Sequence, residues 1–485
     1  MLKDVNVNEL MDSTGVGFGT SGARGTVEAM TDPVCYAYTR AFLQALQLDA
    51  VIPTGAEVVL AGDLRASTPR ILGACVRAVQ DAGFKPVFAG FLPSPAVAYY
   101  AMQRGAASIM VTGSHIPDDR NGIKFNRHDG EILKPDEARI RAQTVPVPEP
   151  FPELAGQSLP PVEDAAAQVY IDRYLDFFAP DCLTGLSVAV YEHSGVARDL
   201  LVTILERLGA RVARLARSEF FIPVDTEAIR AEDIELGRQW AADYDFDAIV
   251  STDGDADRPL IADENGEWLR GDVVGVLCAH QLGIAAIVTP VSSNTVVEAS
   301  GWFDRVYRTR IGSPYVIEQM NEALGEATSV AGYEANGGVL LATDLHRDGR
   351  TLKALPTRDA VLPIIAVLVA AHGQHKTISA LLAELPPRYT ASDRIKNFPT
   401  EQSSARIHEL AEARANIEQV FGSLCGPVRQ TDNTDGLRMT FDNGEIVHLR
   451  PSGNAPELRC YNEADSPERA VELNRSCLEI LAGWR

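Results

Sequence analysis

Apolar and polar residues alternate in blocks along the first part of the chain, and the blocks have the lengths of strands and helices. The short apolar runs 56–63, 85–90 and 106–111 predict strands, whereas segments 67–83 and 94–105 carry apolar residues at helical spacing. Segment 67–83 begins with Ser-Thr and ends with Gly, which are common helix-boundary signals. Strands and helices joined by short connections predict an α/β domain with a parallel sheet and crossover helices.

The same pattern recurs along the chain and changes near its C-terminus. The Pro-rich segment 145–164 lacks periodicity and indicates a domain boundary. Two further α/β patterns follow, and the residues around Asn443-Gly444 then resemble a β-hairpin. The sequence therefore predicts three similar α/β domains with mixed or parallel sheets and a C-terminal α+β domain, with the bounds 1–158, 159–262, 263–376 and 377–485.

Composition restricts the class of protein. Of the 485 residues 46% are hydrophobic and 23% charged, as in ordinary globular proteins, and no apolar run approaches the roughly 18 residues that span a bilayer. The run 360–371 is therefore predicted to be a buried helix. A net charge of −22 argues against a nucleic-acid partner. The polar N-terminus and seven scattered cysteines without a C-x-x-C pair predict reduced thiols in a cytoplasmic protein.

A polar stretch, TGSHIPDDRNGIKF (112–125), follows the predicted strand 106–111 directly. Ligands of parallel α/β sheets bind beyond the carboxyl ends of strands, which is where Ser114 falls. We interpret the stretch as a loop in which Ser114 is a candidate nucleophile beside His115, with Lys124 ten residues on. A plain polar loop and a Ser–His–Asp triad stay open as alternatives, although no G-x-S-x-G motif surrounds the serine.

A second loop, DGDADR (253–258), places Asp253, Asp255 and Asp257 at alternate positions after another apolar run. Three close carboxylates repel one another unless a cation joins them, and Mg²⁺ and Ca²⁺ prefer oxygen ligands. An EF-hand is excluded because its sixth position needs Gly and carries Arg258. A solvated acidic turn is the alternative to a metal site.

Three more loops offer groups suited to sugar and phosphate. In GYEANGG (332–338), Glu334 and Asn336 present an acceptor and an amide between glycines, which suits neighbouring sugar hydroxyls or a tight turn. LRPSGNAPELR (449–459) offers guanidinium, hydroxyl and backbone donors for phosphate, or forms a solvated turn. GFGTSGARG (17–25) carries Arg24 between glycines, in a flexible turn or a loop that faces an anion.

Taken in order, these five loops resemble those of the α-D-phosphohexomutase superfamily, whose members interconvert hexose 6-phosphates and hexose 1-phosphates. The resemblance covers essentially the whole chain and implies four domains around one central cleft, with one loop from each contributing to the site. It implies a phosphoserine at Ser114 and Mg²⁺ bound by the three aspartates and the serine phosphate. It further implies a hexose 1,6-bisphosphate as intermediate and activator.

The resemblance also assigns the remaining candidates. Groups around the transferring phosphoryl group are implied to be Arg24, His115, Lys124 and Arg258, with Lys124 as the first candidate for proton transfer. Sugar hydroxyls are assigned to Glu334 and Asn336. The non-transferring phosphate is assigned to Arg450, Ser452, Gly453 and Asn454, and we add Arg459 from the same segment. Asp118 and Asp119 are expected to shape their turn.

Two departures from some relatives concern histidines. Residues 310–315 (RIGSPY) and Gly338 stand where those relatives carry His, so a second acid/base role of His is in question here. The Glu-x-Asn-Gly-Gly form of the sugar loop is similar to phosphomannomutase-like members. We expect a phosphomannomutase that also uses glucose phosphates, acting as a monomer or dimer. The alternatives are a phosphoglucomutase or phosphoglucosamine mutase, a metal-dependent sugar phosphatase, and a catalytically silent sugar-phosphate-binding protein.

Overall fold

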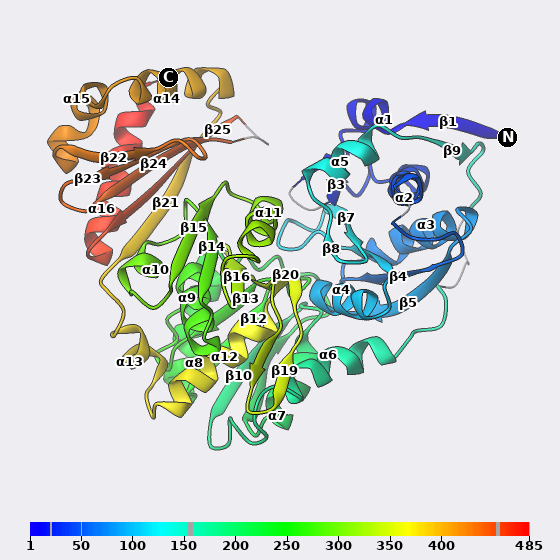
Figure 1. Cartoon of the computed structure of the whole chain (residues 1–485), viewed down its shortest axis with the longest axis horizontal. Helices are drawn as coiled ribbons and strands as arrows, with labels where there is room; N and C mark the ends of the chain where they lie inside the picture. The colour runs from blue at the N-terminus through cyan, green and yellow to red at the C-terminus, as the bar shows by residue number, and fades with distance from the viewer. Residues whose placement is uncertain (20–21, 50, 154–158, 453–455, 485) are drawn as a thin grey trace. The chain divides into compact units, whose positions relative to one another are not determined.

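The computed structural model describes the chain except residues 20–21, 50, 154–158, 453–455 and 485. It divides into two compact units, of which the first comprises 1–286 and 313–381 and the second comprises 287–312 and 382–485. In the described residues no helix is long and apolar enough to cross a membrane. Each unit is described below by itself (Figure 1).

The first sheet has parallel strands on one side and antiparallel strands on the other. The described residues form seven strands in the order β2-β3-β7-β6-β4-β5, with β8 beside β7. Strand β4 runs parallel to β5 and β6, whereas β7 is antiparallel to β6 and β3. The sheet is therefore mixed. Its strands are β2 (Gly17–Phe18), β3 (Gly22–Thr26), β4 (Glu57–Gly62), β5 (Lys85–Phe91), β6 (Ala107–Val111), β7 (Arg120–Arg127) and β8 (Gly130–Glu131).

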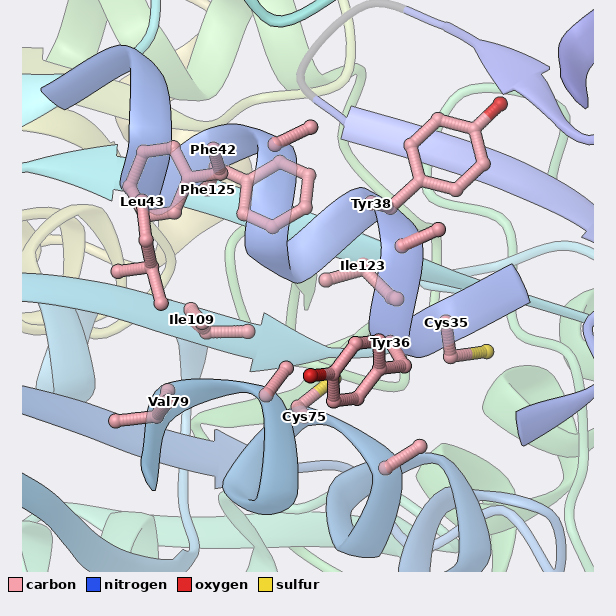
Figure 2. Close-up of a cluster of buried hydrophobic side chains, with 14 of the residues drawn as sticks. Cys35, Tyr36, Tyr38, Phe42, Leu43, Cys75, Val79, Ile109, Ile123 and Phe125 are labelled. Atoms are coloured by element: carbon pink, nitrogen blue, oxygen red, sulfur yellow. The ribbon is translucent and has the colours of Figure 1, made fainter. Parts of the chain in front are cut away.

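The helices of this domain follow the predicted periodicity. Segments 67–83 and 94–105 contain α3 (Thr68–Asp81) and α4 (Ser94–Gln103), and α2 (Asp32–Leu48) precedes β4. In the core between α2 and the sheet, Phe42 stacks on Phe125 of β7 with ring centroids 4.7 Å apart (Figure 2). An antiparallel pair, β1 (Leu2–Asn6) and β9 (Thr144–Pro148), closes the domain, with α1 (Val7–Thr14) and α5 (Lys134–Arg141) nearby in sequence.

The rest of the first unit consists of two further α/β segments. The second sheet has the order β11-β10-β12-β13, in which β10 is parallel to β11 and β12 and antiparallel β13 forms an edge. In the third segment, β17 is antiparallel to both β16 and β20. The strands are β10 (Ser187–His193), β11 (Arg211–Arg217), β12 (Ala248–Thr252), β13 (Pro259–Ala262), β16 (Val330–Tyr333), β17 (Val339–Leu341), β18 (Leu345–Arg347), β19 (Arg350–Leu352) and β20 (Leu355–Asp359).

Helices accompany both of these sheets. The run 360–371 is confirmed as a buried helix, since α12 (Val361–Gly373) buries almost every side chain. The other helices are α6 (Ala165–Leu175), α7 (Arg198–Arg207), α8 (Ala231–Asp243), α9 (Gly271–Leu282), α11 (Ser313–Ala323) and α13 (Ile378–Leu382).

The second unit contains an antiparallel sheet with helices, in the C-terminal region that the sequence predicts to be an α+β domain. Its order is β21-β25-β24-β23-β22, and the hairpin expected around Asn443-Gly444 joins β23 to β24. Gly444 adopts φ +85°, a turn conformation that glycine takes without strain. The elements are β14 (Ala286–Pro290), α10 (Val296–Ala299), β15 (Arg305–Thr309), β21 (Tyr389–Lys396), α14 (Thr400–Ala411), α15 (Arg414–Cys425), β22 (Val428–Asp432), β23 (Leu437–Phe441), β24 (Ile446–Pro451), β25 (Glu457–Ala464) and α16 (Pro467–Ala482).

Candidate active site

The interpretation of residues 112–125 as a single loop is wrong. The loop ends near residue 119, and β7 begins at Arg120, because the chain turns back and pairs antiparallel with β6. Lys124 is therefore a strand residue, opposite Met110 of β6 and Gly22 of β3. A rigid strand, and not a loop, fixes where its amine lies.

Ser114 and the Asp253 loop meet although 139 residues separate them in sequence. Ser114 follows β6, Asp253 follows β12, and the Ser114 hydroxyl donates a 2.6 Å hydrogen bond to Oδ2 of Asp253. Both side chains are fully buried. Ser114 has φ +53°, a left-handed conformation that costs a non-glycine residue about 1–2 kcal/mol and is held only by its surroundings.

The three aspartates form one buried cluster. A carboxylate oxygen of each of Asp253, Asp255 and Asp257 lies within 4.8 Å of the other two. Lys124 separates two of these charges, because its Nζ lies 2.6 Å from Oδ2 of Asp255 and 2.6 Å from Oδ2 of Asp257. Burial opposes the charge on Lys124, but these two carboxylates outweigh it and raise the pKa of the amine. Lys124 is therefore a cation at neutral pH in this arrangement.

The carboxylate oxygens of this cluster that accept no hydrogen bond are suited to bind a divalent cation. Oδ2 of Asp255 accepts from Lys124 and from the Ser94 hydroxyl, and Oδ2 of Asp257 accepts from Lys124 and Arg358. Oδ1 of Asp255 and Oδ1 of Asp257 are buried and have no hydrogen-bond partner among the described residues. Buried carboxylate oxygens without donors are costly, and a hard cation with oxygen ligands removes that cost. The cluster thus has the composition of a metal site.

The pKa values of Asp253 and Asp257 are shifted in opposite directions. Burial, and then the negative charges of Asp255 and Asp257, raise the pKa of Asp253 well above its usual value. Burial also opposes ionisation of Asp257, but Arg358, Lys124 and Arg258 outweigh it and hold its pKa below the usual range. A cation bound between these carboxylates would favour the ionised form of all three.

His115 and Arg258 lie beside the serine. Nη1 of Arg258 donates to Nδ1 of His115 at 2.9 Å, and Ser114 Oγ lies 3.2 Å from the same nitrogen. Because a guanidinium only donates, Nδ1 accepts and the ring proton is on Nε2. Burial and the charges of Arg258 and Arg24 lower the pKa of His115 to about 3, so the imidazole is neutral. Burial and Arg258 likewise lower the pKa of Arg24 to about 10. The region thus concentrates positive charge around Ser114.

The predicted sugar-binding side chains lie next to this cluster in the same unit. Oε2 of Glu334 pairs with Nη1 of Arg358 at 2.9 Å, and Asn336 uses its Oδ1 to accept the N–H of Gly338. The backbone carbonyl of Asn336 accepts from the Thr226 hydroxyl. Glu334 and Asn336 are almost wholly buried, which preorganises both side chains.

Arg358 is the main residue of this site that sequence reasoning missed. It lies on β20, is fully buried, and links Asp257 to Glu334. No motif marks it, since it stands between Thr357 and Asp359 within the short strand β20 and not in a loop after a strand. Its position also explains a departure from relatives. A Cβ on Gly338 would lie 2.7 Å from the Asp257 carbonyl and 2.8 Å from the Arg358 side chain, so a histidine does not fit there.

The predicted phosphate loop belongs to the second unit. Arg450 and Arg459 are register partners on β24 and β25, and the N–H of Ser452 donates to the Glu457 carbonyl at 2.9 Å. Arg450 is oriented by Asp435, whose Oδ2 accepts a hydrogen bond from its Nε at 2.8 Å. No sequence motif singles out Asp435. Gly453 and Asn454 lie outside the described residues.

The chain matches four family models along its length. They are phosphoglucomutase/phosphomannomutase α/β/α domain I (residues 15–146), domain II (168–266), domain III (270–389) and the C-terminal domain (396–479). These matches follow the order in which the candidate loops occur.

Curated relatives extend over nearly the whole chain. A protein named phosphomannomutase from Salmonella muenchen is 44% identical over 473 residues, covering 98% of this chain and 97% of the relative. A phosphomannomutase from Sinorhizobium fredii is 46% identical, with 96% and 99% covered. A phosphoglucosamine mutase from Thermodesulfovibrio yellowstonii is 25% identical, with 94% and 96% covered.

Among solved structures, a phosphoglucomutase/phosphomannomutase family protein from Burkholderia thailandensis has the same fold. The two superpose with a TM-score of 0.74 at 20% identity, over 97% of this chain and 98% of the other.

Proposed function

We propose that this chain, which belongs to the phosphoglucomutase/phosphomannomutase family, interconverts mannose 6-phosphate and mannose 1-phosphate through a phosphoserine at Ser114. The observation that carries the proposal is the Ser114 hydroxyl, held on Asp253 at the edge of a buried aspartate cluster. The names of the 44% and 46% identical relatives support mannose as the sugar. Glucose phosphates are proposed as further substrates.

In the proposed reaction, phosphorylated Ser114 gives its phosphoryl group to the free hydroxyl of the sugar phosphate. The Oγ–P bond breaks, an O–P bond forms on the sugar, and the proton of that hydroxyl finally resides on Ser114. The product is a hexose 1,6-bisphosphate, which reorients and returns its other phosphate to Ser114. Phosphoryl transfer depends mainly on alignment and charge neutralisation.

The residues of the cluster have defined roles in this scheme. Asp253, Asp255 and Asp257, with the serine phosphate, would hold Mg²⁺, which when bound neutralises phosphate oxygens. Lys124, a cation fixed on β7, gives a proton to Oγ of Ser114 as the Oγ–P bond breaks and is reprotonated by the sugar hydroxyl. Arg258 stays oriented because His115 is neutral and accepts its hydrogen bond at 2.9 Å. Arg24 adds positive charge next to the phosphoryl group.

The sugar and its second phosphate require further contacts. Glu334 and Asn336 bind the sugar hydroxyls, and the second phosphate is bound by Arg450, Ser452, Gly453, Asn454 and Arg459. Hexose 1,6-bisphosphate also acts as activator, since it rephosphorylates an enzyme that has lost its phosphate. All seven cysteines are free thiols, which supports the proposed cytoplasmic location. We propose that the protein acts as a monomer or dimer.

A substrate panel tests the proposal. The purified protein, with Mg²⁺ and trace glucose 1,6-bisphosphate, receives mannose 1-phosphate, glucose 1-phosphate or glucosamine 1-phosphate in separate reactions. We expect the 6-phosphate of mannose to form fastest, and Ser114→Ala to abolish its formation. Release of inorganic phosphate without isomerisation would indicate a phosphatase. Binding without turnover, and without phosphate on Ser114 by intact mass, would indicate a silent binding protein.

A further inference from the structure

Arg65 is a buried arginine that holds the Ser114 loop from inside. It is 1% exposed, and its guanidinium donates to four backbone carbonyls at the turn. Nη2 donates to the carbonyls of Ser114 (2.9 Å) and Ile116 (2.6 Å), and Nη1 to those of Pro117 (2.8 Å) and Arg120 (3.0 Å). A planar fork with five N–H donors can satisfy such a curved row of acceptors, whereas an ammonium cannot.

The same arginine is connected to the backbone N–H of Ser114. Nε of Arg65 donates to Oδ2 of Asp63 at 3.2 Å, and this oxygen also accepts from the Thr112 hydroxyl at 2.7 Å. Oγ1 of Thr112 in turn accepts the N–H of Ser114 at 2.8 Å. Both the N–H and the carbonyl of Ser114 are therefore fixed by this network. That accounts for the left-handed φ of Ser114, which its own backbone preference disfavours.

An aromatic ring of the second domain covers the guanidinium. Cζ of Arg65 lies 3.8 Å from the centroid of the Phe221 ring, the geometry of a cation–π contact. Two glycines leave room for this stack. A Cβ on Gly113 would lie 2.6 Å from Cζ of Arg65, and a Cβ on Gly254 would lie 3.1 Å from the Phe221 ring. Gly113 precedes Ser114 and Gly254 follows Asp253, so the stack lies between the two loops that carry the serine and the metal cluster.

We propose that Arg65 and Phe221 are positioning residues, which together keep Ser114 Oγ directed at Asp253 during the reaction. This inference rests on the proposed function, in which Ser114 gives and receives a phosphoryl group within each cycle. Neither residue touches the reacting atoms. Their effect is alignment, and a misplacement of about 1 Å costs on the order of 100-fold in rate.

Phe221 offers the sharper experiment, because its neighbour is a matched control. Phe221→Leu keeps apolar volume but removes the ring face, whereas Phe221→Tyr keeps that face. Phe220, which is 84% exposed, takes the same change to leucine without affecting the stack. Arg65→Lys keeps the positive charge but removes the planar guanidinium. Arg70→Lys is the matched control, because it makes the same change at an arginine that binds Asp32 and the Met30 carbonyl instead of the Ser114 loop.

Two readouts separate alignment from general stability. We expect kcat for mannose 1-phosphate to fall about 10- to 100-fold in Phe221→Leu and Arg65→Lys, with KM close to wild type. Hydrogen exchange of residues 112–122, measured without ligand, should be faster in the same two variants. Phe221→Tyr, Phe220→Leu and Arg70→Lys should match wild type in both readouts.

The outcomes decide the inference and the proposed function separately. Unchanged kcat in Phe221→Leu would overturn the inference, whether or not exchange is faster. Equal effects of Phe220→Leu and Phe221→Leu would also overturn it. If Arg65→Lys does not fold, the Phe221 pair decides alone. If the wild-type protein turned over no hexose phosphate, the proposed function would be contradicted instead. In that case hydrogen exchange still tests the inference: an unchanged exchange rate of residues 112–122 in Phe221→Leu would show that the stack of Phe221 on Arg65 does not hold the Ser114 loop.

Discussion

Arg358 donates through Nη2 to Oδ2 of Asp257 over 2.8 Å, whereas Oδ1 of that carboxylate has a longer ion pair, with Nε of Arg258 at 3.6 Å. Lys124 occupies the same Oδ2 at 2.6 Å, so Oδ1 has no hydrogen-bond partner among the described residues. The other side of the guanidinium pairs with Glu334. One buried arginine therefore orients both an aspartate of the metal cluster and a carboxylate assigned to the sugar.

We predict that Arg358→Gln destabilises the protein by about 3–5 kcal/mol in the absence of divalent cations, because two buried carboxylates lose their common partner. Mg²⁺ should restore part of this loss. Its addition should therefore raise Tm more in the variant than in wild type, as measured by thermal unfolding with and without Mg²⁺. Arg238→Gln, which breaks an exposed pair with Glu267, should change neither value noticeably. An equal Mg²⁺ response in wild type and Arg358→Gln would contradict the prediction.

Two serines each donate a hydrogen bond to the aspartate cluster, which allows a matched test of the nucleophile. Ser114 donates to Asp253 and Ser94 to Asp255, and both hydroxyls are buried. Ser114→Ala should take up no phosphate from glucose 1,6-bisphosphate and lose mutase activity by several orders of magnitude. Ser94→Ala should still gain one phosphate, measured by intact mass. Phosphate uptake by Ser114→Ala would mean that another residue is the acceptor.

The sequence revealed those site residues that stand where a strand ends. Ser114 and Asp253 are recognisable because dense polarity follows buried strands β6 and β12, a place where α/β sheets bind ligands. Arg358 is not recognisable in this way, because it stands inside β20. Arg65 does follow the end of β4, but four of its acceptors are carbonyls of residues 114–120, so only the folded chain shows which groups it binds.

Fold prediction succeeded where local pattern decides the structure. Periodicity and boundary residues were sufficient for α3 and α4, and the Asn-Gly turn for the β23–β24 hairpin. Lys124 was misplaced in a loop because β7 is polar in sequence although six of its eight residues are buried. The strand conformation and the burial of β7 result from its pairing with β6 and β3 and from its contacts in the site, and not from a periodic pattern of apolar residues.

His448 predicts a pH dependence of stability in the second unit. Burial, together with the nearby charge of Arg438, lowers its pKa to about 4. The ring donates through Nε2 to the Asp435 carbonyl at 2.6 Å, and its buried Nδ1 has no hydrogen-bond partner among the described residues. A proton on Nδ1 would therefore find no acceptor among the described residues.

Folding is consequently linked to proton release at this histidine. The unfolded chain takes up the proton below its ordinary value of 6.5, whereas the folded chain does so only near 4, so stability decreases as pH falls from about 6.5 to about 4. We expect a loss of about 2 kcal/mol by pH 5 from this group. Urea unfolding of His448→Gln should lack that part of the pH dependence. His346→Gln, at an exposed histidine, should retain it, and identical pH profiles for wild type and His448→Gln would refute the argument.

The packing of Arg358 requires glycine at position 338. Two glycine-to-alanine substitutions test this, because they are expected to change the free energy of unfolding in opposite directions. A Cβ at Gly338 would lie 2.7 Å from the Asp257 carbonyl and 2.8 Å from Cγ and Cδ of Arg358. Gly338→Ala should therefore destabilise the protein by about 1–3 kcal/mol through overpacking. It should also reduce kcat, because Arg358 can no longer hold Asp257 and Glu334 together.

Gly73, inside α3, has nothing within 4 Å of its Cβ position, so Gly73→Ala should stabilise the protein by about 0.5–1 kcal/mol. Chemical denaturation measures the change in the free energy of unfolding of both variants. If Gly338→Ala left this free energy unchanged, Arg358 could move aside without destabilising the protein.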